Sequence, residues 1–187
     1  IQPIVEKLAA NVSLDVHDGM VLYNHADLHE VGALAHAVRE ARFGQQAFFN
    51  SNVHINQTNM CVLACRFCAF RRSPRAEDAY AMSIEEYLAD LANYAHAIDE
   101  VHSVGGLHPE WDVSHYEELF RRVSETYPRL SIKALTAVEI KHLAQRSSIT
   151  TREVLSRLRV AGLTSIPGGG AEILDDGVRK IICNGKE

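Results

Sequence analysis

Cys61, Cys65 and Cys68 form a C-x3-C-x2-C motif on one short segment of the chain. A structural zinc site takes four protein ligands, and a [4Fe–4S] cluster with a thiolate on every iron also takes four. Three cysteines are therefore one ligand short of either closed site. The motif indicates an iron–sulfur cluster with one iron left open to another ligand, and an open iron is a place where chemistry can occur.

Two other uses of these cysteines stay open. A structural zinc site would need a histidine such as His54 or His108 as its fourth ligand, although zinc frameworks usually show two separated pairs of ligands. The remaining cysteine, Cys183, lies far along the chain. A disulfide is the least favoured use, because we expect a cytosolic protein, whose thiols stay reduced.

The composition indicates one ordinary globular core. The chain has 187 residues, with 19 basic against 24 acidic side chains and a formal net charge of −5. This balance gives no support for a nucleic-acid or membrane-surface partner. The sequence shows neither a long apolar run nor a basic segment followed by an apolar stretch, so we expect no membrane span and no secretion signal.

The hydrophobic pattern divides the chain into an N-terminal helical segment, residues 1–45, and alternating strands and helices over residues 46–187. Ser/Thr-x-x-Glu pairs predict helix starts at Ser83, Ser114 and Thr150. Apolar and β-branched runs predict strands at 47–55, 101–104, 130–135 and 163–166.

Strands separated by single helices imply right-handed crossovers and a parallel sheet, so the fold class is α/β. A complete (β/α)8 barrel needs about 250 residues. We therefore expect residues 46–187 to be the first four β/α units of a barrel, and the chain to be a fragment. Such an open sheet should leave one edge unpaired and an apolar inner face exposed, which predicts poor solubility or self-association.

Ligands of parallel barrels lie at the carboxyl ends of the strands. The cysteine motif follows the first expected strand, and the later strands are followed by Gly105-Gly106 and His108, by Glu139, and by Gly168-Gly169-Gly170 with Glu172. Glycines let the backbone approach a ligand closely. The alternatives are a plain turn for each glycine run and a cap or salt bridge for each glutamate. The triple glycine lacks the Gly-Lys-Ser/Thr of a P-loop.

The cysteine spacing, with Phe67 directly before the last cysteine, resembles the radical S-adenosylmethionine (SAM) superfamily. Its members use the open iron to chelate the amino and carboxylate groups of SAM. The resemblance implies a TIM-barrel-like (β/α) fold and a glycine pair whose carbonyls accept hydrogen bonds from the SAM ammonium. A side chain at either glycine should then weaken SAM binding and spare the cluster.

The resemblance assigns the site residues as follows. The cluster ligands are Cys61, Cys65 and Cys68, and the expected SAM-binding residues are Phe67, Gly105, Gly106, Glu139, Gly169 and Glu172. Glu139 or Glu172 is expected to bind the ribose hydroxyls. We place His54 and His108 in the substrate pocket, and Cys183 outside the ligand set.

Longer segments narrow the resemblance. Residues 54–61 and 65–70 are similar to the futalosine-route enzymes of menaquinone biosynthesis and to the deazaflavin synthases, and residues 104–110, 133–140 and 166–173 are most similar to the aminofutalosine synthases. Those enzymes cleave SAM with a reduced cluster. The resulting 5′-deoxyadenosyl radical adds to the enol ether of 3-[(1-carboxyvinyl)oxy]benzoate, and rearrangement with loss of a carboxylate gives aminofutalosine.

The same resemblance implies partners. We expect a [4Fe–4S] cluster, SAM consumed as a substrate, a small-molecule substrate and an electron donor such as flavodoxin or ferredoxin. The second candidates are the cyclic dehypoxanthine futalosine synthases, which lack the Leu-His-Pro-Glu run of residues 107–110, and the deazaflavin synthases. A non-catalytic metal-binding module is the alternative from another functional class.

Overall fold

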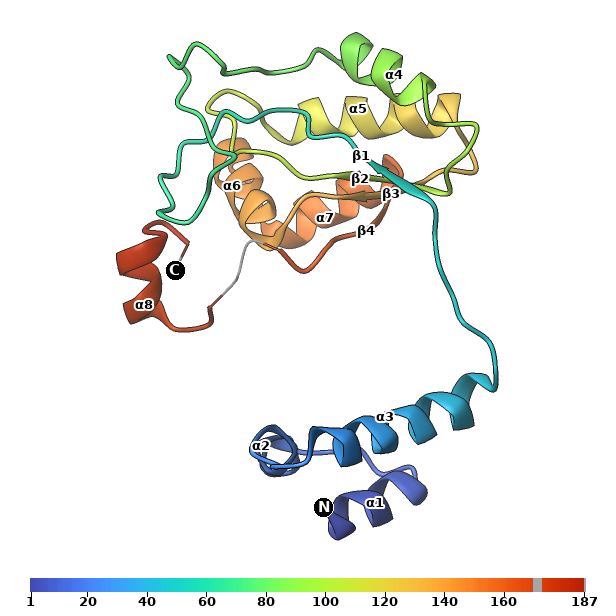
Figure 1. Cartoon of the computed structure of the whole chain (residues 1–187). Coiled ribbons are helices and arrows are strands. Elements are labelled where there is room, and N and C mark those ends of the chain that lie inside the picture. Colours follow the sequence, from blue (N-terminus) through green and yellow to red (C-terminus); the bar gives the residue numbers. More distant parts are fainter. Residues whose placement is uncertain (170–172, 187) are drawn as a thin grey trace. The chain divides into compact units, whose positions relative to one another are not determined.

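The computed structural model describes residues 1–169 and 173–186, and it divides into two compact units, Ile1–Phe49 and Asn50–Glu187. Each unit is built from its own short elements, which are labelled in Figure 1. Within the described residues, none of the helices combines the length and the apolar character that crossing a membrane requires.

The first unit contains three helices, α1 (Gln2–Ala9), α2 (Val16–Tyr23) and α3 (Leu28–Phe43). Asp15 begins α2 in a reciprocal capping box with Asp18. The Lys7 ammonium on α1 lies 2.6 Å from the Asp18 carboxylate and 3.1 Å from that of Asp15, which ties the first helix to the second. Gly44 ends α3 at a φ of 59°, a left-handed value that glycine adopts without strain.

The second unit alternates strands and helices around one parallel sheet. Its elements are β1 (Asn52–His54), α4 (Ile84–Ala92), β2 (Glu100–Ser103), α5 (Val113–Thr126), β3 (Ser131–Ala134), α6 (Ala137–Ser147), α7 (Thr151–Val160), β4 (Leu163–Ser165) and α8 (Asp176–Ile182). The spatial order is β1-β2-β3-β4, with every neighbouring pair parallel. The expected α/β architecture, a partial barrel, is confirmed.

The helix starts follow local capping chemistry. Ser83 and Glu86 cap α4 reciprocally, as predicted, and Thr150 accepts a hydrogen bond from the Glu153 amide at the start of α7. The prediction for α5 was wrong: Asp112, rather than Ser114, is the N-cap. The Asp112 carboxylate accepts from the Ser114 amide at 2.9 Å, and an aspartate at this position caps a helix at least as well as serine.

The strands are shorter than the apolar runs that predicted them. β1 begins only at Asn52, where the chain first pairs with β2. Phe48 and Phe49 are 75% and 94% exposed, so these aromatic residues lie outside the sheet. Aromatic and β-branched content marks a run that could pair, but pairing begins only where a neighbouring strand is present.

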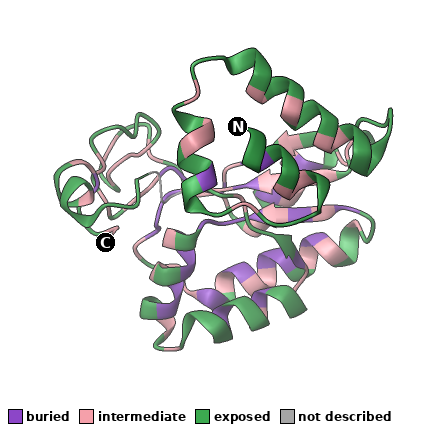
Figure 2. Cartoon of the chain, turned by 90° about the horizontal axis from the view of Figure 1, so that it is seen from below, coloured by how far each residue is buried: buried purple, intermediate pink, exposed green. Residues whose placement is uncertain are grey.

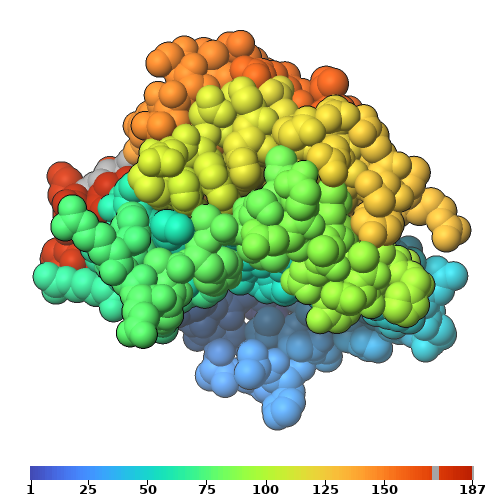
Figure 3. All heavy atoms as spheres, turned by 90° about the horizontal axis from the view of Figure 1, so that it is seen from above, coloured from blue at the N-terminus to red at the C-terminus, as the bar shows by residue number. Residues whose placement is uncertain are grey.

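One face of the sheet packs against the helices. Val101 and Ile132 are almost completely buried in a core that includes Phe120, Leu143 and Leu158 from α5, α6 and α7. In Figure 2 the buried parts, in purple, lie on the strands and on the helices that pack against them. The space-filling view in Figure 3 shows α4 and α5 side by side on the surface of this unit.

The opposite face of the sheet is polar, so the prediction of an apolar inner face was wrong. The strand residues that alternate with the buried ones are Asn52, His54, Glu100, His102, Ser131 and Lys133, all of them exposed or half-buried. Many parallel sheets are apolar on both faces. This one buries only the face that meets the helices.

Candidate functional site

The cysteine motif lies on the long connection between β1 and α4, and the start of that connection is firmly held. Thr58 is fully buried, and its hydroxyl donates to the Tyr80 carbonyl at 2.7 Å. The Asn59 side chain donates to the Asp78 carbonyl at 2.9 Å and accepts from the Tyr80 amide at 2.8 Å. These bonds join both ends of the connection and fix the backbone that enters Cys61.

The glycine pair after β2 packs directly against this backbone. The Gly106 amide donates to the Thr58 carbonyl at 2.9 Å. A Cβ on Gly106 would lie 2.0 Å from the Met60 carbonyl oxygen, and a Cβ on Gly105 would lie 3.0 Å from Nε2 of the Gln57 side chain. Gly106 therefore has a packing role beside the cysteine motif, in addition to any contact with a cofactor.

A buried polar network supports the same strand ends. Gln57 is 2% exposed, and its side chain lies 2.7 Å from the Ser103 hydroxyl and 3.3 Å from the Tyr116 hydroxyl. The Ser103 hydroxyl is also 2.7 Å from the Ile55 carbonyl. The sequence analysis missed Gln57 and Ser103. The available signal was an unbroken polar run, residues 56–59, between an apolar strand and the first cysteine.

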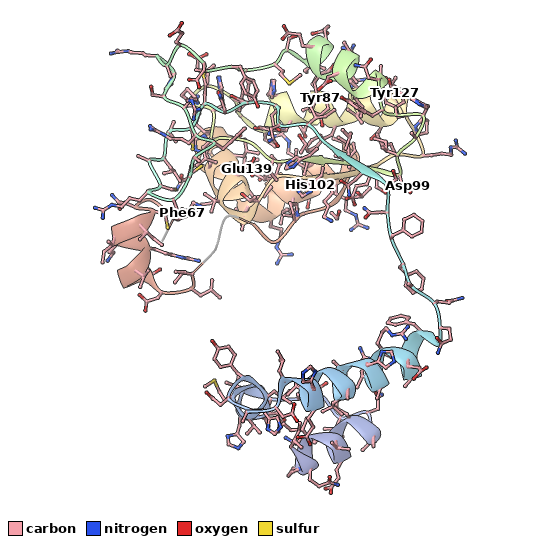
Figure 4. All side chains as sticks on the ribbon, in the orientation of Figure 1. Phe67, Tyr87, Asp99, His102, Tyr127 and Glu139 are labelled. Carbon is pink, nitrogen blue, oxygen red and sulfur yellow. The ribbon has the colours of Figure 1, made fainter. Side chains whose placement is uncertain are left out.

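The three cysteines of the motif line one cavity of about 170 Å³. Their thiols are free, and those of Cys61 and Cys65 are half-buried. The cavity brings together seven of the expected site residues, namely Cys61, Cys65, Cys68, Phe67, Gly105, Gly106 and Glu139, and it adds Thr136 and Lys186. Figure 4 shows Phe67 and Glu139 at the same end of the sheet, opposite the end that carries Asp99.

Glu139 is a buried carboxyl group in this cavity, with only 4% of its surface exposed. It lies in the first turn of α6, where its amide donates to the N-cap hydroxyl of Thr136 at 3.3 Å. The Gly105 amide donates to its Oε1 at 3.1 Å. Burial raises the pKa of Glu139 to about 7, while the hydrogen bonds from Thr136 and Gly105 act in the opposite direction. Its carboxyl group is therefore poised to change charge near neutral pH.

The end of the described chain packs against the cysteine motif. The Arg66 amide donates to the Ile182 carbonyl at 2.8 Å, and the Lys186 ammonium lies 5.3 Å from the centre of the Phe67 ring. Burial raises the pKa of the Cys65 thiol, and the nearby charge of Lys186 lowers it. Cys183 is 2% exposed and does not line the cavity.

Other expected residues lie elsewhere. His108 stacks on Trp111 with 4.2 Å between ring centres, and Trp111 stacks in turn on His115 at 3.9 Å. Burial lowers the pKa of His108 and brings that of His115 to about 4. His54 stands on the polar face of β1. Gly169 does not line the cavity, and Glu172, the other expected SAM-binding residue, lies outside the described residues.

The donor set suits a multi-iron cluster. Within residues 1–169 and 173–186, no three His, Cys, Asp or Glu side chains meet closely enough to hold one metal ion. A cubic cluster presents a different iron to each thiolate, so its ligands surround a volume rather than a point. Three free thiols around one cavity fit that requirement.

Comparison with known proteins matches residues 55–187 to the radical SAM superfamily. The chain is 38% identical to the aminodeoxyfutalosine synthase of Thermus thermophilus, over 98% of this chain and 50% of that protein. It is 34% identical to the cyclic dehypoxanthine futalosine synthase of Streptomyces coelicolor, over 100% of this chain and 48% of that protein. The FO synthase of Mycobacterium tuberculosis is 42% identical over 85% of this chain and 19% of that protein. The chain thus spans about half the length of the futalosine-pathway relatives.

The fold is shared with solved structures of low sequence identity. The structure of methylornithine synthase superposes with a TM-score of 0.71 at 20% identity, over 98% of this chain and 51% of that one. The parallel β/α units, the cysteine motif at the end of β1 and the family match over residues 55–187 agree. This chain belongs to the radical SAM superfamily.

Proposed function

We propose that the chain is the cluster-bearing part of an aminofutalosine synthase. This enzyme would transfer the 5′-deoxyadenosyl group of SAM to 3-[(1-carboxyvinyl)oxy]benzoate in menaquinone biosynthesis. The observation that carries the proposal is the cavity in which the three motif cysteines, the glycine pair and Glu139 meet. The likeness to aminodeoxyfutalosine synthase over 98% of the chain supports this choice of reaction.

Cys61, Cys65 and Cys68 would each bind one iron of a [4Fe–4S] cluster, with the fourth iron open to SAM. When bound and reduced, the cluster supplies the electron that cleaves a carbon–sulfur bond of SAM. We also propose a cytoplasmic protein served by an electron donor such as flavodoxin or ferredoxin. Cys183 would stay outside the ligand set, because its buried thiol does not line the cavity.

The remaining cavity residues would position SAM. Gly105 and Gly106 expose backbone at the cavity wall, where carbonyl oxygens can accept hydrogen bonds from an ammonium group. Phe67 offers an apolar ring beside the last cysteine. A carboxylate has about four lone-pair sites, so Glu139 can accept from a ribose hydroxyl while it accepts from the Gly105 amide. Gly169 and Glu172 are proposed as further adenosine or ribose contacts, and His108 as a substrate-pocket residue.

Anaerobic reconstitution tests this assignment. We expect the protein carrying this chain to bind four irons and four sulfides, to cleave SAM when reduced, and to form aminofutalosine from the enol ether. Cyclic dehypoxanthine futalosine synthase is the second candidate, because that relative matches 100% of this chain at 34% identity. Its substrate should be assayed in parallel. Iron binding without SAM cleavage would support a non-catalytic module, and bound zinc without iron would contradict both enzyme assignments.

A further inference from the structure

The polar face of the sheet holds three basic side chains at one level. The register pairs His54 of β1 with His102 of β2, and His102 with Lys133 of β3. We call His54, His102 and Lys133 the inner-face row. The interior of a parallel barrel is usually filled by layers of branched apolar side chains. A row of nitrogen-bearing side chains in that position needs a different explanation from packing.

The two imidazole rings of the row form a stacked pair. Their centres are 4.6 Å apart with an interplanar angle of 16°. Burial, His54 and Lys133 together lower the pKa of His102, and Glu100 acts in the opposite direction. A positive charge on His102 is therefore disfavoured by its neighbours, and an anion bound at the row would favour it.

Lys133 is balanced by one carboxylate. Its ammonium lies 3.5 Å from Glu100, which also accepts a hydrogen bond from the Asn50 side chain at 3.0 Å. The charges of Lys133 and Glu100 offset each other. One carboxylate bound at the row would be balanced by one proton on His102. The charges thus favour a single carboxylate group at the row, so the second carboxylate of a substrate with two would lie elsewhere.

The inner-face row lies close to the cysteine cavity along the chain. His102 precedes the cavity residue Gly105 by three positions, and Lys133 precedes Thr136 by the same interval. Three residues of extended chain span at most about 11 Å. Figure 4 shows His102 on the strands between Glu139 at one end of the sheet and Asp99 at the other. A small molecule held at the row could therefore present its other end to the cavity.

We propose that the inner-face row binds a carboxylate group of the small-molecule substrate, with Lys133 supplying the charge and the His102 imidazole, stacked on His54, donating a hydrogen bond. The proposal rests on the proposed function for the identity of that substrate, which carries two carboxylates. The chemistry that we assign to the row itself is a carboxylate site that takes up one proton when the carboxylate binds.

The test compares variants that should weaken substrate binding with one variant that should tighten it. In the cluster-loaded protein, Lys133→Gln and His102→Gln should each weaken binding of 3-[(1-carboxyvinyl)oxy]benzoate about tenfold or more, the usual scale for a lost charge-assisted hydrogen bond. Glu100→Gln should tighten binding severalfold, because it removes the competing carboxylate. The matched controls His96→Gln and Lys141→Gln, both on exposed positions away from the sheet, should change nothing.

Three further measurements show whether weaker binding comes from the loss of the carboxylate contact itself. The double variant Glu100→Gln/Lys133→Gln should bind as weakly as Lys133→Gln, which excludes an unpaired Glu100 as the cause of the loss. Calorimetry in buffers of different ionisation enthalpy should report uptake of about one proton per substrate bound to the wild type, as the charge balance requires. SAM affinity should be unchanged in every variant.

The outcomes separate the two proposals. Wild-type turnover of the enol ether with unchanged substrate affinity in Lys133→Gln and His102→Gln would overturn the inner-face row and leave the aminofutalosine assignment standing. Absence of that turnover, combined with benzoate binding that depends on the row in the same way, would overturn the assignment and leave the row standing. Equal binding of benzoate and benzamide to the wild type would overturn the row.

Discussion

Glu139 shows how one buried residue can link stability to cofactor binding. It lies in the cavity wall and accepts from the Gly105 amide. Its pKa of about 7 in the folded protein is above the ordinary glutamate value of 4.5. The folded state therefore holds a proton that the unfolded state releases between these two pH values, so Glu139 makes the protein less stable as pH rises through this window.

Replacing Glu139 by glutamine should remove this pH dependence. We expect Glu139→Gln to unfold at higher urea concentration than the wild type at pH 8, by a free energy on the order of a few kcal/mol, and to differ little at pH 4.5. Urea unfolding of the cluster-free protein at the two pH values is the measurement. A variant less stable than the wild type at pH 8 would contradict the assigned pKa.

The close contact between Gly106 and Met60 leaves no room for a side chain at position 106. From the sequence, we expected a side chain there to disturb SAM alone, but a Cβ would lie 2.0 Å from the Met60 carbonyl oxygen, directly before the first cysteine. Gly106→Ala should therefore lower both the iron content and the melting temperature. A Cβ on Gly32 would have no neighbour within 4 Å, and Gly32→Ala in helix α3 should raise stability by about 0.5–1 kcal/mol. Full iron loading in Gly106→Ala would refute the packing role.

Substitution of Cys183 should affect stability, whereas substitution of Cys68 should affect cluster binding. Cys183 is 2% exposed, so Cys183→Ala should cost about 1 kcal/mol of stability through lost packing, while iron and sulfide content stay at the wild-type level. Cys68→Ala should lose the cluster. Iron analysis with thermal unfolding separates the two effects, and loss of iron in Cys183→Ala would add that residue to the ligand set.

At the scale of elements, helix α5 depends on a cap that the sequence pattern did not identify. Ser114 with Glu117 matches a capping box, yet Asp112 accepts from the Ser114 and His115 amides. Asp112→Ala should lower stability by about 1 kcal/mol, whereas Ser114→Ala should have no measurable effect. Chemical unfolding of the two variants compares them directly. Equal losses would show that both side chains share the cap.

The strands were predictable in number, order and direction, because strand and helix patterns alternate along the sequence. Their inner face was not predicted correctly, although the signal was present. The triplets Asn52-Val53-His54, Glu100-Val101-His102 and Ser131-Ile132-Lys133 alternate polar and apolar residues. A rule that parallel sheets are apolar on both faces overrode that pattern. Local alternation was the better guide to what this sheet buries.

At the scale of the molecule, the cavity assembles segments that are far apart in the sequence. The spacing of Cys61, Cys65 and Cys68 could be read from one short motif, and the glycines and Glu139 from their places after strands. Thr136 has the same signal as Glu139, because it follows the third strand directly. Lys186 could not be predicted, because it carries no local signal. His108 has the right position in the sequence, but its ring stacks on Trp111. Strand ends thus predict which segments meet, whereas side-chain packing decides which residues line the cavity.

The packing of the chain end against the cysteine motif has a thermodynamic consequence. The Ile182 carbonyl accepts from the Arg66 amide, and a Cβ on Gly185 would lie 2.7 Å from the Leu63 side chain. Any ligand that orders the motif should therefore also order α8, by linkage between binding and local folding. Hydrogen exchange should slow in residues 176–186 when the cluster is loaded, with α7 as an internal reference that does not change. The free energy of cluster binding would then be distributed over two segments separated by more than a hundred positions. Local unfolding of α8 would lower the affinity of the motif for the cluster.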